Sequence, residues 1–125
     1  MAAFRSKFEQ QIANWFKQRN INAEYEPCKI GYTIPASYHT YTPDWSLNQR
    51  NIYYEAKGKL DVATRQKMTH IKNSNPGLTF RIIFQNPSVK IRKNAKMTYG
   101  EWATKMGFEW CDFRKGIPKQ WLKNG

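Results

Sequence analysis

Residues 42–58 read TPDWSLNQRNIYYEAKG and hold two short runs of strand-forming side chains around a polar turn. The first run follows Asp44, the second ends at Lys57, and the polar residues 48–51 separate them. Aromatic and β-branched side chains favour strands, and a short polar connection of this kind joins antiparallel neighbours. This stretch therefore predicts a β-hairpin around which the rest of the chain is arranged.

A helix and two strands are expected before the hairpin. Ser6 and Glu9 have the Ser-x-x-Glu spacing of a capping box. The apolar side chains that follow recur at helical spacing: Phe8, Ile12, Trp15 and Phe16. We expect this helix to end near Asn20. Alternating side chains then predict strands over residues 21–25 and 28–34, with a proline between them as an edge or bulge position.

Helical and strand patterns alternate after the hairpin. Residues 61–73 predict a helix and residues 78–84 a strand rich in β-formers. The side chains expected on the inner side of that helix are Val62, Met68 and Ile71. Thr98 and Glu101 form a second possible capping box, which opens a short helix to about residue 106. Residues 108–110 are expected to form a last short strand, and Trp121 and Leu122 an apolar clasp near the end.

The length of the chain suits one domain with its own core. Its aromatic content of 15% argues against disorder, because such side chains need a place to be buried. The order of elements is helix, strands, helix, strand, helix. We therefore predict a single α/β domain over residues 1–125, built on a mixed sheet flanked by helices.

The charge of the chain is its most unusual bulk property. There are 21 Lys and Arg residues against 9 Asp and Glu, which gives a net charge of +12. Such a field favours a polyanionic partner, because neutralised phosphates release their counterions. A protein that is merely soluble and basic is the alternative that charge alone leaves open.

Several other classes of protein are disfavoured. Cys28 and Cys111 are far apart and indicate neither a disulfide framework nor a structural zinc site. No apolar run approaches the length of a membrane span, and the residues after Met1 do not form an apolar leader. We therefore expect a soluble cytoplasmic protein with no membrane partner.

Asp44, Glu55 and Lys57 carry the chemistry of the predicted hairpin. Asp44 begins one strand and Glu55 lies near the end of the other, so their carboxylates can lie opposite each other. Lys57 follows Glu55 by two residues, so both side chains point to the same face. Carboxylate oxygens suit Mg²⁺, which can activate a water beside a phosphate. Lys57 would then orient or deprotonate that water, or stabilise the pentavalent phosphate.

Each of these residues also has an ordinary explanation when it is taken alone. Glu55 and Lys57 fit a solvated face that forms salt bridges, and Asp44 fits a turn after proline. Their combination in one hairpin of a strongly basic chain favours phosphodiester hydrolysis over those explanations.

Pro43-Asp44 followed by Glu55-Ala56-Lys57 resembles the Pro-Asp…(Asp/Glu)-x-Lys signature of the restriction-enzyme-like nucleases. More narrowly, the chain resembles the bacteriophage T-seven endonuclease I family of Holliday junction-resolving enzymes. The stretches that carry this resemblance are residues 3–6, 34–37, 39–44, 55–58 and 99–101. Order and spacing hold from about residue 3 to Trp121, which is nearly the whole chain.

This resemblance implies a restriction-endonuclease-like fold and a domain-swapped homodimer with two composite active sites. In each site Glu9 would come from one subunit, and Asp44, Glu55 and Lys57 from the other. All four would be catalytic, with Mg²⁺ held by Asp44, Glu55 and Glu9, and with Mn²⁺ also accepted. Residues 33–38 would form the bridge between the swapped halves. The residues alone favour Glu9 as a helix cap, and the resemblance reverses that interpretation.

The resemblance also implies branched DNA as the partner, no small-molecule cofactor, and the host cytoplasm as the location of a phage-encoded enzyme. Basic residues near the site are the candidate DNA contacts, because they can hold the phosphate backbone. They are Arg5, Lys7, His39, Lys59, Arg65, Lys67, Lys90, Arg92 and Lys93. A solvated loop is nearly as good an explanation for Lys90, Arg92 and Lys93, and a hydrogen-bonding role in a loop is an equal one for His39. His70 is expected at the surface, and most tryptophans in the core or in a dimer interface.

These features predict a structure-selective, metal-dependent DNA endonuclease that cuts four-way junctions as a dimer. Two alternatives stay open at this point. One keeps the chemistry but changes the target, as a sequence-specific nicking or homing-type endonuclease. The other is a non-catalytic basic DNA-binding protein in which Asp44 and Glu55 are only structural.

Overall fold

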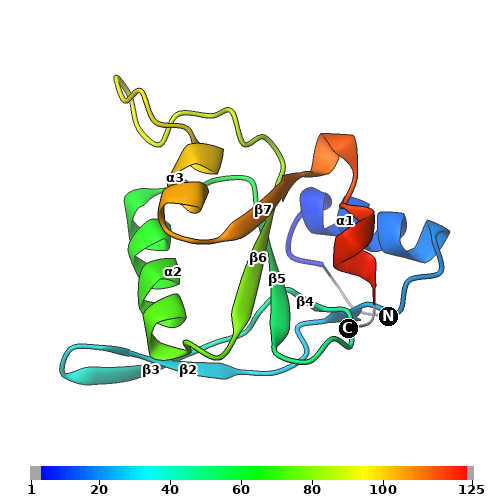
Figure 1. Ribbon diagram of the computed structural model, residues 1–125, viewed down its shortest axis with the longest axis horizontal. Coiled ribbons are helices and arrows are strands. Elements are labelled where there is room, and N and C mark those ends of the chain that lie inside the picture. Colours follow the sequence, from blue (N-terminus) through cyan, green and yellow to red (C-terminus); the bar gives the residue numbers. More distant parts are fainter. Residues whose placement is uncertain (1–3, 124–125) are drawn as a thin grey trace.

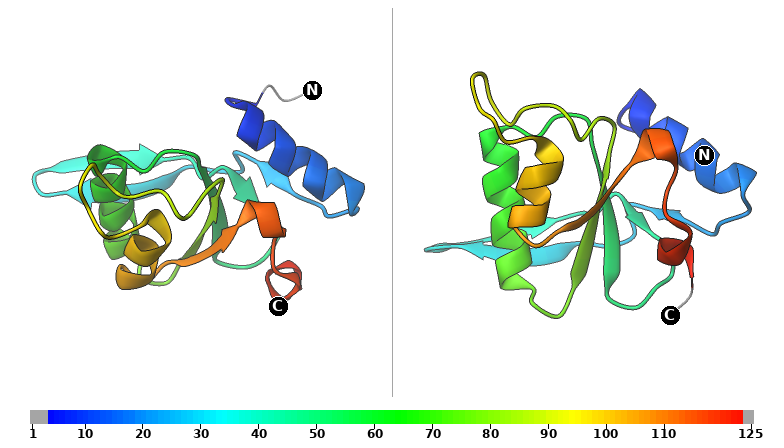
Figure 2. Two further views of the ribbon diagram at one scale, coloured as in Figure 1. Left: turned by 90° about the horizontal axis from the view of Figure 1, so that it is seen from above. Right: turned by 45° about the horizontal axis from the view of Figure 1, so that its top comes forward.

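The computed structural model describes residues 4–123 and has three layers (Figures 1 and 2). A central sheet is covered by α2 and α3 on one face, and by α1 and the C-terminal turns on the other. The helices are α1 (Lys7–Gln18), α2 (Val62–Ser74) and α3 (Tyr99–Lys105), with 3-10 turns η1 (Phe113–Lys115) and η2 (Lys119–Leu122). None of the helices within residues 4–123 is long and apolar enough to cross a membrane.

The central sheet is mixed, as predicted. Its five strands lie in the order β1 (Glu24–Tyr25), β4 (Trp45–Ser46), β5 (Ile52–Lys57), β6 (Thr79–Phe84) and β7 (Glu109–Asp112). The first three are antiparallel neighbours, whereas β5, β6 and β7 run parallel. The predicted hairpin is confirmed, since β4 and β5 pair with Trp45 opposite Tyr54. The carboxyl ends of β5 and β6 therefore meet at one edge of the sheet.

A second, two-stranded sheet packs against α2 and extends past its end (Figure 1). It consists of β2 (Ile30–Ile34) and β3 (Ser37–Tyr41), paired from Ile30 opposite Tyr41 to Ile34 opposite Ser37. The sequence left the polar residues 36–42 unassigned, and most of them form β3. Residues 33–38, predicted to bridge two subunits, form the tip of this hairpin within one chain. Their role between subunits stays a prediction.

Two hydrophobic clusters hold the layers together, one on each face of the sheet. Alternation along β6 sends Ile82 and Phe84 to the α2–α3 side and Ile83 to the α1 side. The predicted apolar stripe of α1 is confirmed by Ile12 and Phe16, which are 0% and 2% exposed. As expected for tryptophans in a core, Trp45, Trp102 and Trp121 are buried, and Trp15 and Trp110 are partly buried.

Two expectations about local structure are wrong. Val62 was expected on the inner side of α2, but it is 59% exposed. It precedes Ile71 by two and a half helical turns at about 3.6 residues per turn, which places the two side chains on opposite sides of the helix. The strand predicted over residues 21–25 begins only at Glu24, because β1 pairs with the short strand β4.

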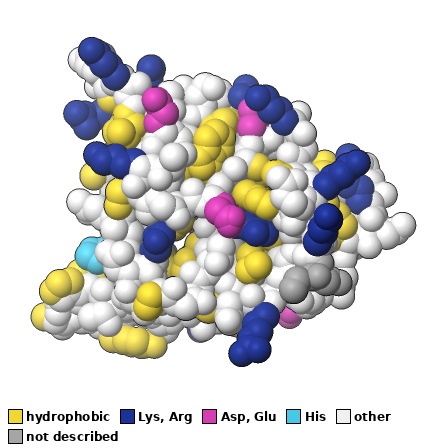
Figure 3. Space-filling model, viewed as in Figure 1, with side chains coloured by type: hydrophobic (Ala, Val, Ile, Leu, Met, Phe, Trp, Pro, Cys, Tyr) yellow, Lys and Arg dark blue, Asp and Glu magenta, His cyan; other side chains and the backbone are white. Residues whose placement is uncertain are grey.

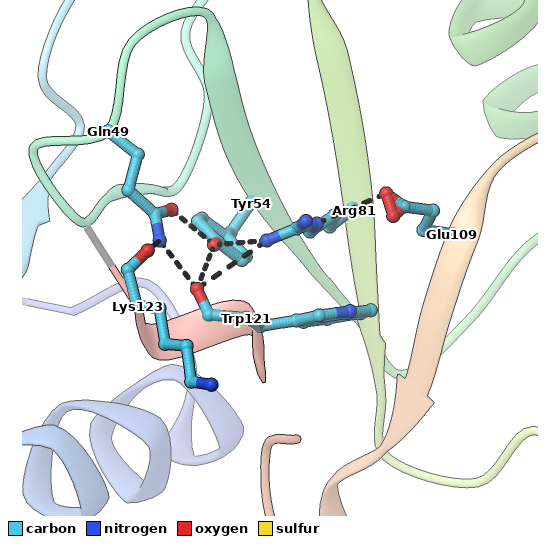
Figure 4. Close-up of polar contacts among 6 residues, drawn as sticks. All are labelled: Gln49, Tyr54, Arg81, Glu109, Trp121 and Lys123. Atoms are coloured by element: carbon cyan, nitrogen blue, oxygen red, sulfur yellow. Dashed lines mark hydrogen bonds and ion pairs between the residues drawn. The ribbon is translucent and has the colours of Figure 1, made fainter. Parts of the chain in front are cut away.

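The C-terminal turn is fastened to the sheet by a buried polar network (Figure 4). The Tyr54 hydroxyl lies 2.5 Å from Gln49 Oε1 and 3.2 Å from the Trp121 carbonyl oxygen, and it accepts from Arg81 Nη1 at 2.9 Å. The Gln49 amide also donates to the carbonyls of Trp121 and Lys123, at 2.5 and 3.0 Å. This network and the buried indole of Trp121 confirm the predicted clasp near the end of the chain.

Candidate active site

One small cleft gathers the four predicted catalytic side chains. It lies where the N-terminal half of α1 meets the end of β3, the start of β4 and the carboxyl end of β5, and it has a volume of about 370 Å³. Its lining is mostly polar and consists of Arg5, Glu9, Thr40, Tyr41, Thr42, Asp44, Glu55, Ala56, Lys57 and Lys67. Side chains from widely separated parts of one chain therefore share one cleft.

Asp44 is held against β5 by backbone contacts. The Ala56 N–H donates to Asp44 Oδ2 at 2.8 Å, and the Asp44 N–H donates to Glu55 Oε1 at 3.3 Å. Both contacts follow from the hairpin register, which places Trp45 opposite Tyr54. The second carboxylate oxygen of Asp44, Oδ1, accepts no hydrogen bond from residues 4–123 and stays available to a ligand.

Glu55 is buried and is held at both of its carboxylate oxygens. The Tyr41 hydroxyl donates to Oε1 at 2.5 Å, and Lys57 Nζ lies 3.0 Å from Oε2. The side chains of Glu55 and Lys57 are only 9% and 21% exposed, so solvent screens this ion pair less than a surface pair. The prediction that these two residues share a face of the strand is confirmed.

Glu9 carries out only half of the predicted capping box. The Ser6 hydroxyl caps α1 by accepting from the Glu9 N–H at 3.1 Å. The Glu9 carboxylate instead accepts from the Tyr25 hydroxyl, and Ser6 Oγ lies 3.4 Å from its other oxygen. The side chain is buried and lines the cleft, and among residues 4–123 its carboxylate accepts no hydrogen bond from the Ser6 backbone N–H, which a complete capping box would require. This placement brings Glu9 into the cleft with Asp44 and Glu55, but within one chain, so its donation by a partner subunit stays a prediction.

The crowding of carboxylates in the cleft changes the acidity of its groups. Burial, followed by the charge of Glu55, raises the pKa of Asp44 to about 8, although the Ala56 N–H and Lys57 oppose that shift. Burial likewise raises the pKa of Tyr41 well above its ordinary value and that of Tyr25 to about 12. Both tyrosine hydroxyls therefore stay protonated at physiological pH, and the cleft favours a bound proton or cation beside Asp44.

The donor set of the cleft fits a hard divalent cation. Mg²⁺ commonly takes one or two carboxylates and completes its shell with water and substrate phosphate. Asp44 offers a free oxygen, and Glu55 and Glu9 line the same cleft. Across the described part of the chain, no group of three or more His, Cys, Asp or Glu side chains is arranged so that it could hold a metal ion by itself. Asp44, Glu55 and Glu9 as metal ligands therefore stay a prediction.

The candidate DNA contacts fall into two groups around the cleft. Arg5 and Lys67 line the cleft itself. A second cavity of about 410 Å³ has four basic side chains in its lining, together with Asp61; they are Lys59, Lys90, Arg92 and Lys93. The chain links the two cavities, since Lys57 lines the cleft and Lys59 lines the second cavity. On the face seen in Figure 3, several Lys and Arg side chains gather over the loop before α3.

Three of the candidate DNA contacts, Arg65, His39 and Lys7, line neither of these two cavities. Arg65 Nη1 donates to the carbonyls of Leu60 and Ile91 at 2.7 and 3.0 Å, so its guanidinium holds the loop that carries Lys90, Arg92 and Lys93. His39 lies in β3, with Nε2 2.9 Å from Ser37 Oγ and its ring stacked on a tyrosine. This is the local hydrogen-bonding role that the sequence left open. Lys7 is exposed on α1 and does not line the cleft.

Tyr25 and Tyr41 are the site residues that the sequence did not single out. Each hydroxyl donates to one of the predicted carboxylates. Tyr41 stands directly before Thr42-Pro43-Asp44 and is buried, so its position next to the motif was the available signal. Tyr25 carried no such signal, because its partner Glu9 is brought to it only by the packing of α1.

A larger groove shares no lining residue with the cleft that holds Asp44, Glu55 and Lys57. It has a volume of about 840 Å³ and runs between the C-terminal end of α1 and the turns after β7. The one carboxylate among its lining residues, Asp112, is already bound by Arg114 at 2.8 Å. Of these two hollows in the described part of the chain, the smaller cleft is the one that combines several carboxylates with an ammonium group, so it is the candidate active site.

The known proteins to which this chain is similar are phage endonucleases. The family model described as phage endonuclease I matches residues 1–125. Endonuclease I of Escherichia phage T7 is 38% identical over 123 residues, covering 98% of this chain and 80% of that protein. Endodeoxyribonuclease 1 of Enterobacteria phage T3 is 36% identical over 121 residues, covering 97% of this chain and 78% of that protein. The chain belongs to the phage endonuclease I family.

Proposed function

We propose that this protein is a divalent-metal-dependent DNA endonuclease that hydrolyses phosphodiester bonds in four-way and other branched DNA. The observation that carries this proposal is the cleft that joins Glu9, Asp44 and Glu55 with the ammonium of Lys57. The names of the relatives, endonuclease I and endodeoxyribonuclease 1, support cleavage of DNA within the strand.

Each side chain of the cleft has a distinct task in this reaction. When bound, Mg²⁺ would supply a Lewis acid that activates a water and offsets charge on the phosphate. Asp44, Glu55 and Glu9 would hold the cation through their carboxylate oxygens. Lys57 is 3.0 Å from Glu55 Oε2, so its ammonium lies where it can orient the attacking water or stabilise the developing negative charge. Mn²⁺ prefers similar ligands and is expected to replace Mg²⁺.

A two-fold dimer suits a branched substrate, because it presents two sites in a symmetric arrangement. The β2–β3 hairpin supports a swap between the subunits. Glu9 precedes the tip of this hairpin in the chain, and Asp44, Glu55 and Lys57 follow it. If the hairpin opened, each N-terminal part could make the same contacts with a partner chain. Ala36 at the tip has a φ of 73°, a left-handed conformation that costs a non-glycine residue about 1 kcal/mol or more, and opening could relieve that strain.

The basic surface supports DNA as the polyanion. Lys67 and Arg5 enter the cleft, and the basic cavity beside it continues the positive surface away from the reacting phosphate. Contacts of this kind position the DNA backbone without reading bases. Selection by the shape of the DNA, rather than by its sequence, is therefore the expected mode of recognition.

Cleavage of a four-way junction and of a linear duplex of arbitrary sequence, each in Mg²⁺ or in EDTA, tests the proposal. We expect preferential cutting of the junction, no cutting in EDTA, and a dimer by light scattering. Lys57→Ala should reduce the cleavage rate by about 10²–10⁴-fold while the junction is still bound. Lys105→Ala, at the exposed end of α3, is the matched control and should cut normally.

The other outcomes separate the alternatives. Equal cutting of an arbitrary linear duplex excludes selection by branched structure. Cutting that depends on one linear sequence identifies a nicking or homing-type endonuclease instead. Binding without cutting in any divalent metal, or full activity of Lys57→Ala, excludes the proposed active site.

A further inference from the structure

Each of the two glutamates of the cleft accepts a hydrogen bond from a tyrosine hydroxyl. The Tyr41 hydroxyl donates to Glu55 Oε1 at 2.5 Å. The Tyr25 hydroxyl donates to Glu9 Oε1. Each tyrosine thus occupies one oxygen of a carboxylate that is proposed to bind metal.

The position of the Tyr41 hydroxyl is fixed by the core. Tyr41 is 8% exposed, ends β3 in the cluster on the α2–α3 face, and packs edge-on against Phe80 at 6.3 Å. Lys67 Nζ lies 5.7 Å from the centre of its ring. Because the ring cannot move freely, its hydroxyl gives Glu55 Oε1 a fixed donor, and Lys57 lies beside the other oxygen.

Tyr25 contacts Glu9 without lining the cleft itself. Its ring packs against Phe4 and Trp45, with ring centres 4.8 and 4.9 Å away, and these two rings also contact each other. Its hydroxyl also accepts from the Arg5 N–H at 3.3 Å. The hydrogen bond to Glu9 draws that carboxylate into the cleft, whereas a complete capping box would turn it back to the start of α1.

We infer that Tyr41 and Tyr25 are positioning residues, which orient Glu55 and Glu9 so that the cleft binds its divalent cation. This inference rests on the proposed function. A carboxylate that binds metal is itself usually held by hydrogen bonds, and loss of such a partner typically weakens metal binding by about 10–100-fold. A purely structural tyrosine would affect stability and leave the affinity of the folded protein for metal unchanged.

The variants Tyr41→Phe and Tyr25→Phe remove one oxygen each and keep the packed ring. Tyr99→Phe is the matched control for the Mn²⁺ titration and for stability, because Tyr99 is also 8% exposed, stacks on Phe84 and does not line the cleft. Tyr99 does line the second, basic cavity, so this variant is not used as a control for DNA binding. Titration of the DNA-free protein with Mn²⁺ in a calorimeter measures affinity without reference to activity. Thermal unfolding in EDTA measures the stability of each variant, and junction cleavage over a range of Mg²⁺ concentrations gives the concentration for half-maximal rate.

We expect Tyr41→Phe to weaken Mn²⁺ binding by about 10–100-fold and to raise the half-maximal Mg²⁺ concentration in parallel. Tyr25→Phe should have a smaller effect in the same direction, because its ring is only half-buried, and Tyr99→Phe should have none. Excess Mg²⁺ should restore cleavage by the two cleft variants. Should Tyr41→Phe fail to fold, the Tyr25→Phe titration decides the question.

Unchanged Mn²⁺ affinity in both folded cleft variants overturns this inference while the proposed function stands. An equal loss of affinity in Tyr99→Phe also overturns it, since the effect would then come from general destabilisation. If the wild-type protein itself binds no Mn²⁺ and cuts in EDTA, the metal dependence of the proposed function fails and this inference fails with it.

Discussion

Replacing Asp44 by Asn should stabilise the metal-free protein, and the gain should increase with pH. The cleft raises the pKa of Asp44 from an ordinary 3.8 to about 8, mainly through burial and through the charge of Glu55. The folded protein therefore holds a proton that the unfolded chain releases. The penalty for ionising Asp44 is absent below about pH 4, grows as the pH rises, and is complete above about pH 8.

The size of the effect follows from the same shift. At about 1.36 kcal/mol for each pH unit, the ionised carboxylate costs the folded state at most about 6 kcal/mol. The cleft is open to water, and solvent and side-chain movement lower that cost, so we expect about 2 kcal/mol near pH 8. For a chain of this length, that corresponds to a rise in Tm of roughly 5–10 °C. Asn at position 44 can still accept the Ala56 N–H, so the backbone contact is kept.

Thermal unfolding in EDTA, followed by circular dichroism at about pH 5 and about pH 8, measures this difference. Asp112→Asn is the control, because the Arg114 guanidinium lowers the pKa of that carboxyl and its loss should give no gain that increases with pH. A gain from Asp44→Asn of equal size at both pH values would refute the electrostatic reasoning. A variant less stable than the wild type at the higher pH would refute it as well.

Three further predictions concern the framework around the cleft. Tyr54→Phe should lower the free energy of unfolding in urea by about 1–3 kcal/mol, since it leaves the polar partners of a buried hydroxyl unpaired. Thr98→Ala should cost about 1 kcal/mol in the same assay by removing the cap of α3, and no loss would mean that the capping box contributes nothing. Lys93→Ala should leave Tm unchanged and should reduce the salt dependence of junction binding by about one phosphate contact. Arg65→Ala should lower Tm, because its guanidinium holds two backbone carbonyls. The reverse pattern would mean that Arg65 contacts DNA and that Lys93 stabilises the fold.

Local patterns in the sequence predicted those parts of the fold that depend on neighbouring residues. The apolar stripe of α1 and the β4–β5 hairpin are confirmed, because helix and strand periodicity are properties of short stretches. The hairpin also brings Asp44, Glu55 and Lys57 together. These three residues could be proposed as a site from strand geometry alone.

Features that depend on packing between distant segments were not predictable in this way. Strand β3 has only one buried side chain, Tyr41, and lacks clear apolar alternation, so its pairing with β2 and packing against α2 decide its structure. The role of Glu9 was undecided on residues alone, because its cap and its cleft position compete for one carboxylate. The hydrogen bond from Tyr25, which lies 16 residues away in the chain, decides where the Glu9 carboxylate lies.

The cleft draws its groups from both hydrophobic clusters, since Glu9 is carried by α1 on one face and Tyr41 belongs to the cluster on the other. Under the proposed function, nuclease activity therefore requires that both faces of the sheet are packed, which is a late step of folding. A nascent chain that has formed its sheet and α2 but has not docked α1 would already be a strongly basic polymer able to hold nucleic acid. It would lack a complete set of cutting groups until both layers were in place. The active site would therefore be complete only in the folded chain. An incompletely folded or partly unfolded chain would bind nucleic acid without cutting it.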